Sequence, residues 1–258
     1  MVALLEYSEK GAPRRVLLED ARALGMDAVR VRLPQSARFR RDRFLREAAE
    51  VMSRLGVRTV CFEARFDRCD FFIDRGFREP DTRRLFALKA ADVLCAAGVT
   101  GAVAVISPIA DAEAMAAINR VCSRFRRLMV DVGAETGRIC AEIRRRTGAS
   151  VIERPAGAVL MRAEGAIVFR GSEAVRFSDR CAVFCEDGEM REKIKGGKVV
   201  ERVTFGAYTA PEGYDIAELL AAAVEAGRLD VDKLSVSEVG FKTDILRDDT
   251  KNGKKEIN

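Results

Sequence analysis

The chain has 258 residues, of which 48% are hydrophobic and 33% charged, a composition typical of a globular protein with a substantial core. Histidine is absent, which excludes Ser-His-Asp and Cys-His catalysis and removes the commonest metal ligand. No apolar run reaches the roughly 18 residues needed to span a bilayer, and the N-terminus lacks the basic-then-apolar order of a signal peptide. We therefore expect a cytoplasmic protein without a membrane partner.

The net charge is +5, and the excess of basic over acidic residues lies within residues 1–150. Acidic residues interleave with these arginines almost everywhere, which favours a solvated or internally paired surface. We therefore expect no nucleic-acid partner. Seven irregularly spaced cysteines without a C-x-x-C motif are expected to be small buried side chains, with no disulfide and no metal site.

Residues 1–98 are predicted to form an N-terminal α/β lobe. Residues 28–33 alternate apolar side chains with Arg30 and Arg32, which indicates a strand with one exposed face. Asp81 or Thr82 is placed to cap a helix that stops at Gly98. The elements expected here are strands over 2–7, 28–33 and 58–63, and helices over 14–24, 41–55 and 82–97.

Residues 99–208 are predicted to form a second lobe. Its short apolar runs are separated by amphipathic stretches, which favours parallel strands joined by crossover helices. Lys195-Gly-Gly-Lys198 is interpreted as a surface turn in a hairpin-like region, with residues 199–205 as the second strand. The other elements expected here are strands over 102–106, 128–132, 150–153, 166–169 and 181–185, and helices over 111–124 and 135–147.

Residues 209–246 are expected to pack back onto these lobes through a helix over 216–226 and a strand over 234–241. Residues 247–258 have the composition of a disordered tail. The fold class is therefore α/β with a mainly parallel sheet, a degenerate Rossmann-like unit beside an N-terminal α/β lobe. No Pro/Gly/Ser-rich linker separates the lobes, so one continuous sheet and two separate sheets both remain open.

Ligands of open α/β sheets bind outside the carboxyl ends of the strands. Asp131 lies near the end of the strand predicted over 128–132. Its distance along the chain from Ser107 is close to the usual separation of about 20 residues between the end of the first strand and a carboxylate that accepts hydrogen bonds from a ribose. The alternative is that Asp131 caps the following turn. The candidate ligand-binding residues at these strand ends are Ser107, Asp131, Gly133, Thr136, Arg154, Gly171 and Ser172.

Residues 102–172 resemble the nucleotide-binding half of shikimate-dehydrogenase-like and glutamyl-tRNA-reductase-like proteins. The likeness rests on the order of the strands, on Asp131, and on the last strand leading into Arg170-Gly171-Ser172. It implies a Rossmann unit with NAD as its cofactor. Ser107-Pro108 stands where the family has its glycine loop, which removes the close backbone approach to a pyrophosphate, and no catalytic residue carries over.

The segment from residue 64 to residue 84 mixes arginines, acids and phenylalanines. Its phenylalanines indicate that it packs onto the core. Its arginines could grip a phosphate or carboxylate bidentately, or its own acids could neutralise them. The candidate anion-binding residues are Arg65, Arg68, Arg75 and Arg78.

Three functional classes follow from these features. The first is a non-catalytic binding or regulatory module for a nucleotide or small anionic ligand. The second is an NAD(P)-dependent oxidoreductase or transferase with an atypical nucleotide loop, and the third is a structural or assembly protein without a ligand. The missing glycines and the missing histidine favour the first class over the second.

Overall fold

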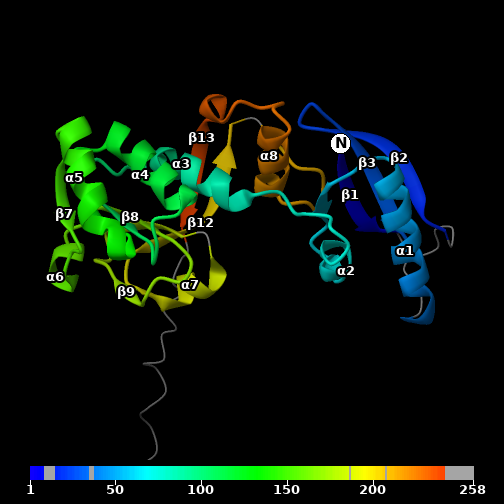
Figure 1. Ribbon diagram of the computed structural model, residues 1–258, viewed down its shortest axis with the longest axis horizontal. Coiled ribbons are helices and arrows are strands. Elements are labelled where there is room, and N and C mark those ends of the chain that lie inside the picture. The colour runs from blue at the N-terminus through cyan, green and yellow to red at the C-terminus, as the bar shows by residue number, and fades with distance from the viewer. Residues whose placement is uncertain (9–14, 35–37, 186, 207, 242–258) are drawn as a thin grey trace, which may run out of the picture.

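The computed structural model describes residues 1–8, 15–34, 38–185, 187–206 and 208–241 of this α/β protein. These residues form a four-stranded mixed sheet, called sheet A, and a separate seven-stranded, mostly parallel sheet, called sheet B. Figure 1 shows the two sheets side by side, with α8 (Ile216–Glu225) between them. The apolar face of α8 contacts both: Leu219 packs in the core of sheet A, and Leu220 packs against α3 (Thr82–Ala96) and β12 (Lys198–Phe205).

Sheet A has the strand order β2-β3-β1-β4. Strand β1 lies in the middle and runs parallel to β3 and β4, while β2 runs antiparallel to β3 at the edge. Leu5 and Val31 pack on one face against α1 (Arg38–Arg54), and Leu4 packs on the other face against α8. The strands are β1 (Val2–Tyr7), β2 (Leu17–Ala23), β3 (Met26–Leu33) and β4 (Thr59–Phe62).

The helix predicted over 14–24 is wrong, because residues 17–23 form β2. Leu24 and Gly25 both have positive φ, 51° and 77°, and they join Ala23 to its cross-strand partner Met26. A two-residue turn with positive φ at both positions matches the twist of a hairpin. Gly25 therefore lies in a hairpin turn and not at the end of a helix. A glycine in the left-handed conformation is typical of both, so its presence does not distinguish them.

The helix predicted over 82–97 is confirmed as α3, and the Asp81 carboxylate caps it by accepting from the Arg84 N–H over 2.9 Å. A short helix, α2 (Cys69–Ile73), precedes it. Helix α3 belongs to the predicted N-terminal lobe of residues 1–98, but it packs elsewhere. Its buried residues, including Ala90 and Leu94, pack in the core of sheet B together with α4 (Ala112–Arg124).

Sheet B has the strand order β13-β12-β10-β8-β5-β6-β7. Counted from β5, its six parallel strands follow the order 3-2-1-4-5-6 of doubly wound α/β sheets, with β13 added antiparallel at the edge. The predicted parallel strands and their crossover helices are confirmed. The strands are β5 (Val103–Ile106), β6 (Arg127–Asp131), β7 (Ser150–Glu153), β8 (Gly165–Val168), β10 (Ala182–Cys185), β12 and β13 (Val236–Phe241).

The two faces of sheet B are covered differently. Helices α3, α4 and α5 (Thr136–Thr147) cover one face, and the 3-10 turn η1 (Gly133–Glu135) leads into α5. The short helices α6 (Gly157–Leu160) and α7 (Gly188–Lys193) cover the other face, together with a two-stranded ribbon of β9 (Val175–Arg176) and β11 (Ile194–Lys195). None of the helices in the described ranges has the length and apolar character to cross a membrane.

The turn at Lys195–Lys198 is confirmed, but the hairpin is wrong. Strand β11 before the turn pairs with β9, whereas β12 after it pairs with β10 and β13. Gly196 and Gly197 both have positive φ, and they carry the chain from the ribbon into sheet B. A second 3-10 turn, η2 (Val231–Lys233), precedes β13, and the predicted tail at 247–258 lies outside the described residues.

Candidate functional site

The carboxyl edge of sheet B holds the residues that the sequence nominated for a cofactor. Two of them, Ser107 and Ser172, are buried and bound to the chain itself. The Ser107 hydroxyl donates to the carbonyl of Ile109 over 2.7 Å, and the Ser172 hydroxyl donates to the carbonyl of Phe169 over 2.8 Å. Each serine hydroxyl therefore donates its proton to a carbonyl of its own loop and not to a ligand.

Pro108 lies two residues after the end of β5, the strand at which the direction of the crossovers reverses. A Cβ atom on Gly133 would lie 2.2 Å from the Pro108 carbonyl oxygen, and one on Gly171 would lie 3.4 Å from the Pro108 Cγ. Both glycines have positive φ. Arg154 turns toward the same place and donates from Nη2 to the Gly133 carbonyl over 3.2 Å. The loops at this edge thus pack against one another.

Asp131 ends β6, and its backbone carbonyl accepts from the Ser107 N–H over 2.8 Å. Its carboxylate has no hydrogen bond or ion pair with another described residue. The Thr136 hydroxyl caps the turn instead, since it accepts from the Val132 N–H over 2.8 Å and donates to the Gly133 carbonyl over 2.9 Å. The Asp131 carboxylate therefore remains available to accept hydrogen bonds from a ligand.

The four nominated arginines do not converge. Arg68 pairs with Asp42 at 3.4 Å, and Arg78 pairs with Glu225 at 3.0 Å. Arg75 donates to the Phe71 carbonyl over 2.9 Å and lies 3.5 Å above the Phe71 ring. Phe66, Phe72 and Phe77 anchor the segment in the core of sheet A. Of the four, Arg65 lines the cavity of about 580 Å³ at the end of sheet A.

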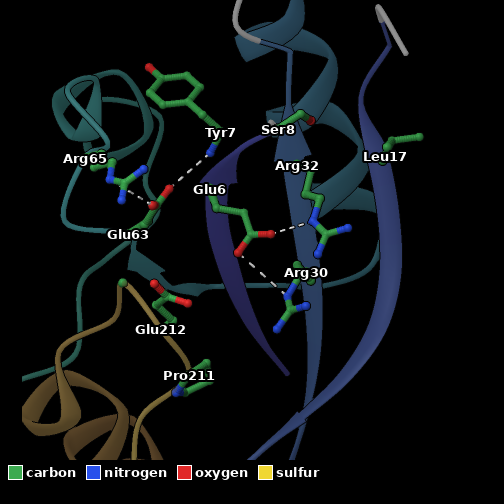
Figure 2. Close-up of a pocket in the computed structure, with 11 residues that line it drawn as sticks. Glu6, Tyr7, Ser8, Leu17, Arg30, Arg32, Glu63, Arg65, Pro211 and Glu212 are labelled. Atoms are coloured by element: carbon green, nitrogen blue, oxygen red, sulfur yellow. Dashed lines mark hydrogen bonds and ion pairs between the residues drawn. The ribbon is translucent and has the colours of Figure 1, made fainter. Parts of the chain in front are cut away.

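That cavity, the Glu6 cleft, is the strongest candidate site. It has a volume of about 580 Å³ and lies at the carboxyl ends of β1, β3 and β4, on the same face of sheet A as α8 but beyond the part that α8 covers. Figure 2 shows Arg30 and Arg32 rising from β3 on one side of Glu6, with Glu63, Arg65 and the loop of Pro211 and Glu212 on the other side. The carboxyl end of a parallel sheet is where ligands of α/β proteins bind.

Glu6 is the hub of the cleft, with 16% of its side chain exposed. Its Oε1 accepts from the Arg32 Nε over 2.5 Å, and its Oε2 accepts from the Tyr214 hydroxyl over 3.1 Å. Arg30 lies farther off, with Nε 3.8 Å from Oε2. Glu6 therefore holds Arg32 and Tyr214 in place and pairs only loosely with Arg30.

Two polar groups of the cleft lack hydrogen bonds. Among the residues that the structure describes, the buried Arg30 Nε has no hydrogen-bond partner, and the Arg30 side chain as a whole is 30% exposed. Ser8 is 3% exposed, and its hydroxyl also has no partner in the described ranges. An unpaired buried polar group costs about 1–3 kcal/mol, so both have donor capacity that a ligand could satisfy.

The opposite wall of the cleft is acidic. Glu63, with 15% of its side chain exposed, accepts from the Tyr7 N–H over 3.4 Å and lies 3.9 Å from the Arg65 Nε. Gly213 closes against it, since a Cβ atom on Gly213 would lie 2.8 Å from the Glu63 Cγ. The Gly213 carbonyl accepts from the Ala64 N–H over 2.8 Å, which fixes this loop to the end of β4. The cleft thus has basic and acidic walls.

Two tyrosines beside the cleft, Tyr7 and Tyr214, have raised pKa values. Burial raises the pKa of the Tyr214 phenol far above its usual value, and Glu6 adds to the shift. Burial and a hydrogen bond to Asp67 raise the pKa of Tyr7 to about 12. Both phenols therefore stay protonated near neutral pH and are poor general bases.

A second cavity of about 410 Å³ lies where α3, α8 and β12 meet, and Glu218 of α8 lines it. Burial raises the pKa of the Glu218 carboxyl to about 7, and the charges of Asp215 and Glu79 add to the effect. A hydrogen bond from the Phe62 backbone acts in the opposite direction. Glu218 therefore titrates near neutral pH, between the two sheets.

The described residues contain no group of three or more Cys, Asp or Glu side chains placed to hold a metal ion. None of the seven cysteines, all within the described ranges, forms a disulfide; five are buried, Cys69 is half-buried and Cys95 is exposed. Burial raises the pKa of the Cys61 and Cys181 thiols to about 12, which disfavours the reactive thiolate. Comparison of the sequence with models of known protein families gives no match, and comparison with curated proteins gives none either.

Sequence reasoning missed the Glu6 cleft because its lining residues come from five separate parts of the chain. One signal was present: Arg30 and Arg32 alternate with apolar residues in β3 and were expected on an exposed face. Figure 2 shows the loop of Pro211 and Glu212 facing this side of the sheet, and that loop follows β12 of the other sheet. The local sequence pattern of this loop does not indicate that it lies beside sheet A.

Proposed function

We propose that this protein is a non-catalytic binding module for a small ligand with an anionic group, and that the ligand occupies the Glu6 cleft. The observation that carries the proposal is the Arg30 guanidinium, which lines the cleft and, within the described part of the chain, has only a long ion pair to Glu6. A planar guanidinium binds carboxylate and phosphate oxygens bidentately. The anionic group would contact Arg30, and the Ser8 hydroxyl would donate a second hydrogen bond.

The acidic wall restricts the rest of the ligand. Glu212 is exposed and, among the described residues, has neither a hydrogen bond nor an ion pair, while Glu63 accepts only one long hydrogen bond. Ligand groups facing this wall should therefore be hydrogen-bond donors such as hydroxyl or ammonium groups. Binding rather than catalysis is favoured because the tyrosines of the cleft stay protonated and Glu6 is held by Arg32.

A thermal-shift screen tests the proposal with dicarboxylates, amino acids, sugar phosphates and adenine nucleotides. At least one compound should stabilise the wild type but not the Arg30→Ala variant. Arg22→Ala is the matched control, because Arg22 is exposed on β2 of the same sheet and lies outside the cleft. A compound that stabilises wild type and Arg30→Ala equally would place its site elsewhere. No stabilisation by any compound would favour a structural or assembly protein.

The second candidate is an NAD(P)-dependent oxidoreductase or transferase, as the resemblance to shikimate-dehydrogenase-like and glutamyl-tRNA-reductase-like proteins suggests. The Rossmann order of sheet B and the unpaired carboxylate of Asp131 support it. The packing of Pro108 against Gly133 and Gly171 weighs against it, because a pyrophosphate needs that space. We therefore rank this enzymatic function below the ligand binding proposed for the Glu6 cleft.

A further inference from the structure

The ribbon of β9 and β11 borders a second polar cleft, which we call the Lys195 cleft. It has a volume of about 560 Å³, and its charged lining residues are Arg176, Arg180, Lys195 and Asp179. All four are exposed, and Met161 and the buried ring of Phe177 complete the apolar part. The cleft therefore has three cations and one carboxylate, an excess of positive charge that the Glu6 cleft lacks.

The cations are placed together at an electrostatic cost. Lys195 of β11 and Arg176 of β9 are direct partners in the register of the ribbon. Like charges directly opposite one another destabilise a strand pair. In the described ranges, the charged side-chain groups of these three cations form no hydrogen bond or ion pair with another residue. The positive charge is therefore uncompensated within the described structure.

The backbone beneath these cations is fixed. Gly196 and Gly197 have φ values of +70° and +79°, and a Cβ atom on Gly196 would lie 2.4 Å from the Phe177 carbonyl oxygen. The Phe177 N–H donates to the Lys195 carbonyl over 2.9 Å, and the Lys198 N–H donates to the Cys181 carbonyl over 2.7 Å. The two sides of the cleft are thus tied together, so the cations are held near one another before any ligand binds.

From this placement we propose that the Lys195 cleft binds the phosphate group of a small phosphorylated molecule. A dianion matches the charge of three cations and one carboxylate, and the two guanidiniums bind phosphate oxygens bidentately while lysine acts as a point charge. The cations are confined to one cleft, whose volume suits a small phosphorylated molecule rather than an extended polyanion. The site is separate from the Glu6 cleft and does not depend on the function proposed there.

Isothermal calorimetry with pyrophosphate tests the proposal on the full chain. We expect saturable binding that weakens as the salt concentration rises from about 50 to about 300 mM, because salt screens exposed charges. Arg176→Ala and Lys195→Ala should each weaken the affinity at least about tenfold, the scale of losing one charge-assisted contact. Arg145→Ala, which removes an exposed arginine of α5, should leave it unchanged.

The variants also report on the protein without ligand. Removing one of two opposed cations should leave the melting temperature unchanged or raise it, and pyrophosphate should raise it less in Arg176→Ala and Lys195→Ala than in the wild type and Arg145→Ala. A large drop in melting temperature without ligand would show that Arg176 or Lys195 has a structural role and would overturn the proposal. So would absent pyrophosphate binding, binding to phosphatidic-acid vesicles alone, or binding that Arg30→Ala abolishes and Arg176→Ala does not.

Discussion

Arg32 donates from its Nε to the Glu6 carboxylate over 2.5 Å, and both side chains line the Glu6 cleft. Glu6→Ala should therefore destabilise the protein by about 2 kcal/mol, since it removes the carboxylate that accepts from the Arg32 Nε and from the Tyr214 hydroxyl. Glu19→Ala is the matched control, because Glu19 pairs with the same Arg32 from an exposed position and should cost under about 0.5 kcal/mol. Urea unfolding measures both, and equal effects would contradict the role of Glu6.

The contact between Gly133 and Pro108 predicts a large cost for a methyl group at residue 133. Gly133→Ala must adopt a left-handed conformation and also displace the Pro108 carbonyl, so we expect a loss of at least about 3 kcal/mol. Gly148→Ala has the same positive φ with open space around its Cβ, and should lose about 1 kcal/mol. Similar losses in chemical denaturation would show that Pro108 does not fill the edge of sheet B.

The raised pKa of Glu218 predicts that the stability of the protein depends on pH. The Glu218 carboxyl keeps its proton up to about pH 7 in the folded protein, against about 4.5 in the unfolded chain. The folded state binds more protons between these values, so the free energy of unfolding falls as the pH rises through this window. With allowance for solvent screening, we expect a loss on the order of 2 kcal/mol.

Glu218→Gln should remove this dependence, since the amide does not titrate. Urea unfolding at pH 4 and pH 8 should show the variant gaining stability over the wild type at pH 8 only. Glu47→Gln, at an exposed position of α1, is the control and should follow the wild type at both pH values. A wild-type stability that rises between pH 5 and pH 7 relative to Glu218→Gln would contradict the raised pKa.

The packed edge of sheet B predicts weak nucleotide binding. We expect NAD to bind no more tightly than about 200 µM, roughly −5 kcal/mol, because Pro108 fills the space and offers no N–H to a pyrophosphate. NADP should bind more weakly still, since the Asp131 carboxylate repels a 2′-phosphate. Calorimetry with wild type and Asp131→Ala checks this. Micromolar NAD binding that Asp131→Ala abolishes would move the functional site to this edge.

The sequence predicted sheet B well because its signals are local. Asp111 caps α4 by accepting from the Ala114 N–H, and Gly148 ends α5 in the left-handed conformation. Strands buried on both faces appear as short apolar runs between such helices. Strand β2 was missed for the opposite reason: it is an edge strand whose residues have no strict alternation, and its pairing with β3 decides its conformation.

The candidate site was less accessible to sequence reasoning. Ser107 and Ser172 follow strands as expected, yet their hydroxyls are used by neighbouring carbonyls, which no spacing rule reveals. The partners of Arg68 and Arg78, Asp42 and Glu225, lie outside the segment whose own acids were expected to neutralise them. Long-range pairing thus decided which polar groups remain available for a ligand.

The most direct test of the Glu6 cleft is an NMR titration of ¹⁵N-labelled protein with the compound that stabilises it best. Amide signals of Tyr7, Ser8 and Glu63 should shift with the same dissociation constant, together with the Nε–H signal of Arg30, and these shifts should vanish in Arg30→Ala. Shifts confined to Asp131 and Thr136, with Ser8 and Arg30 unchanged, would contradict the account and place the ligand at the edge of sheet B.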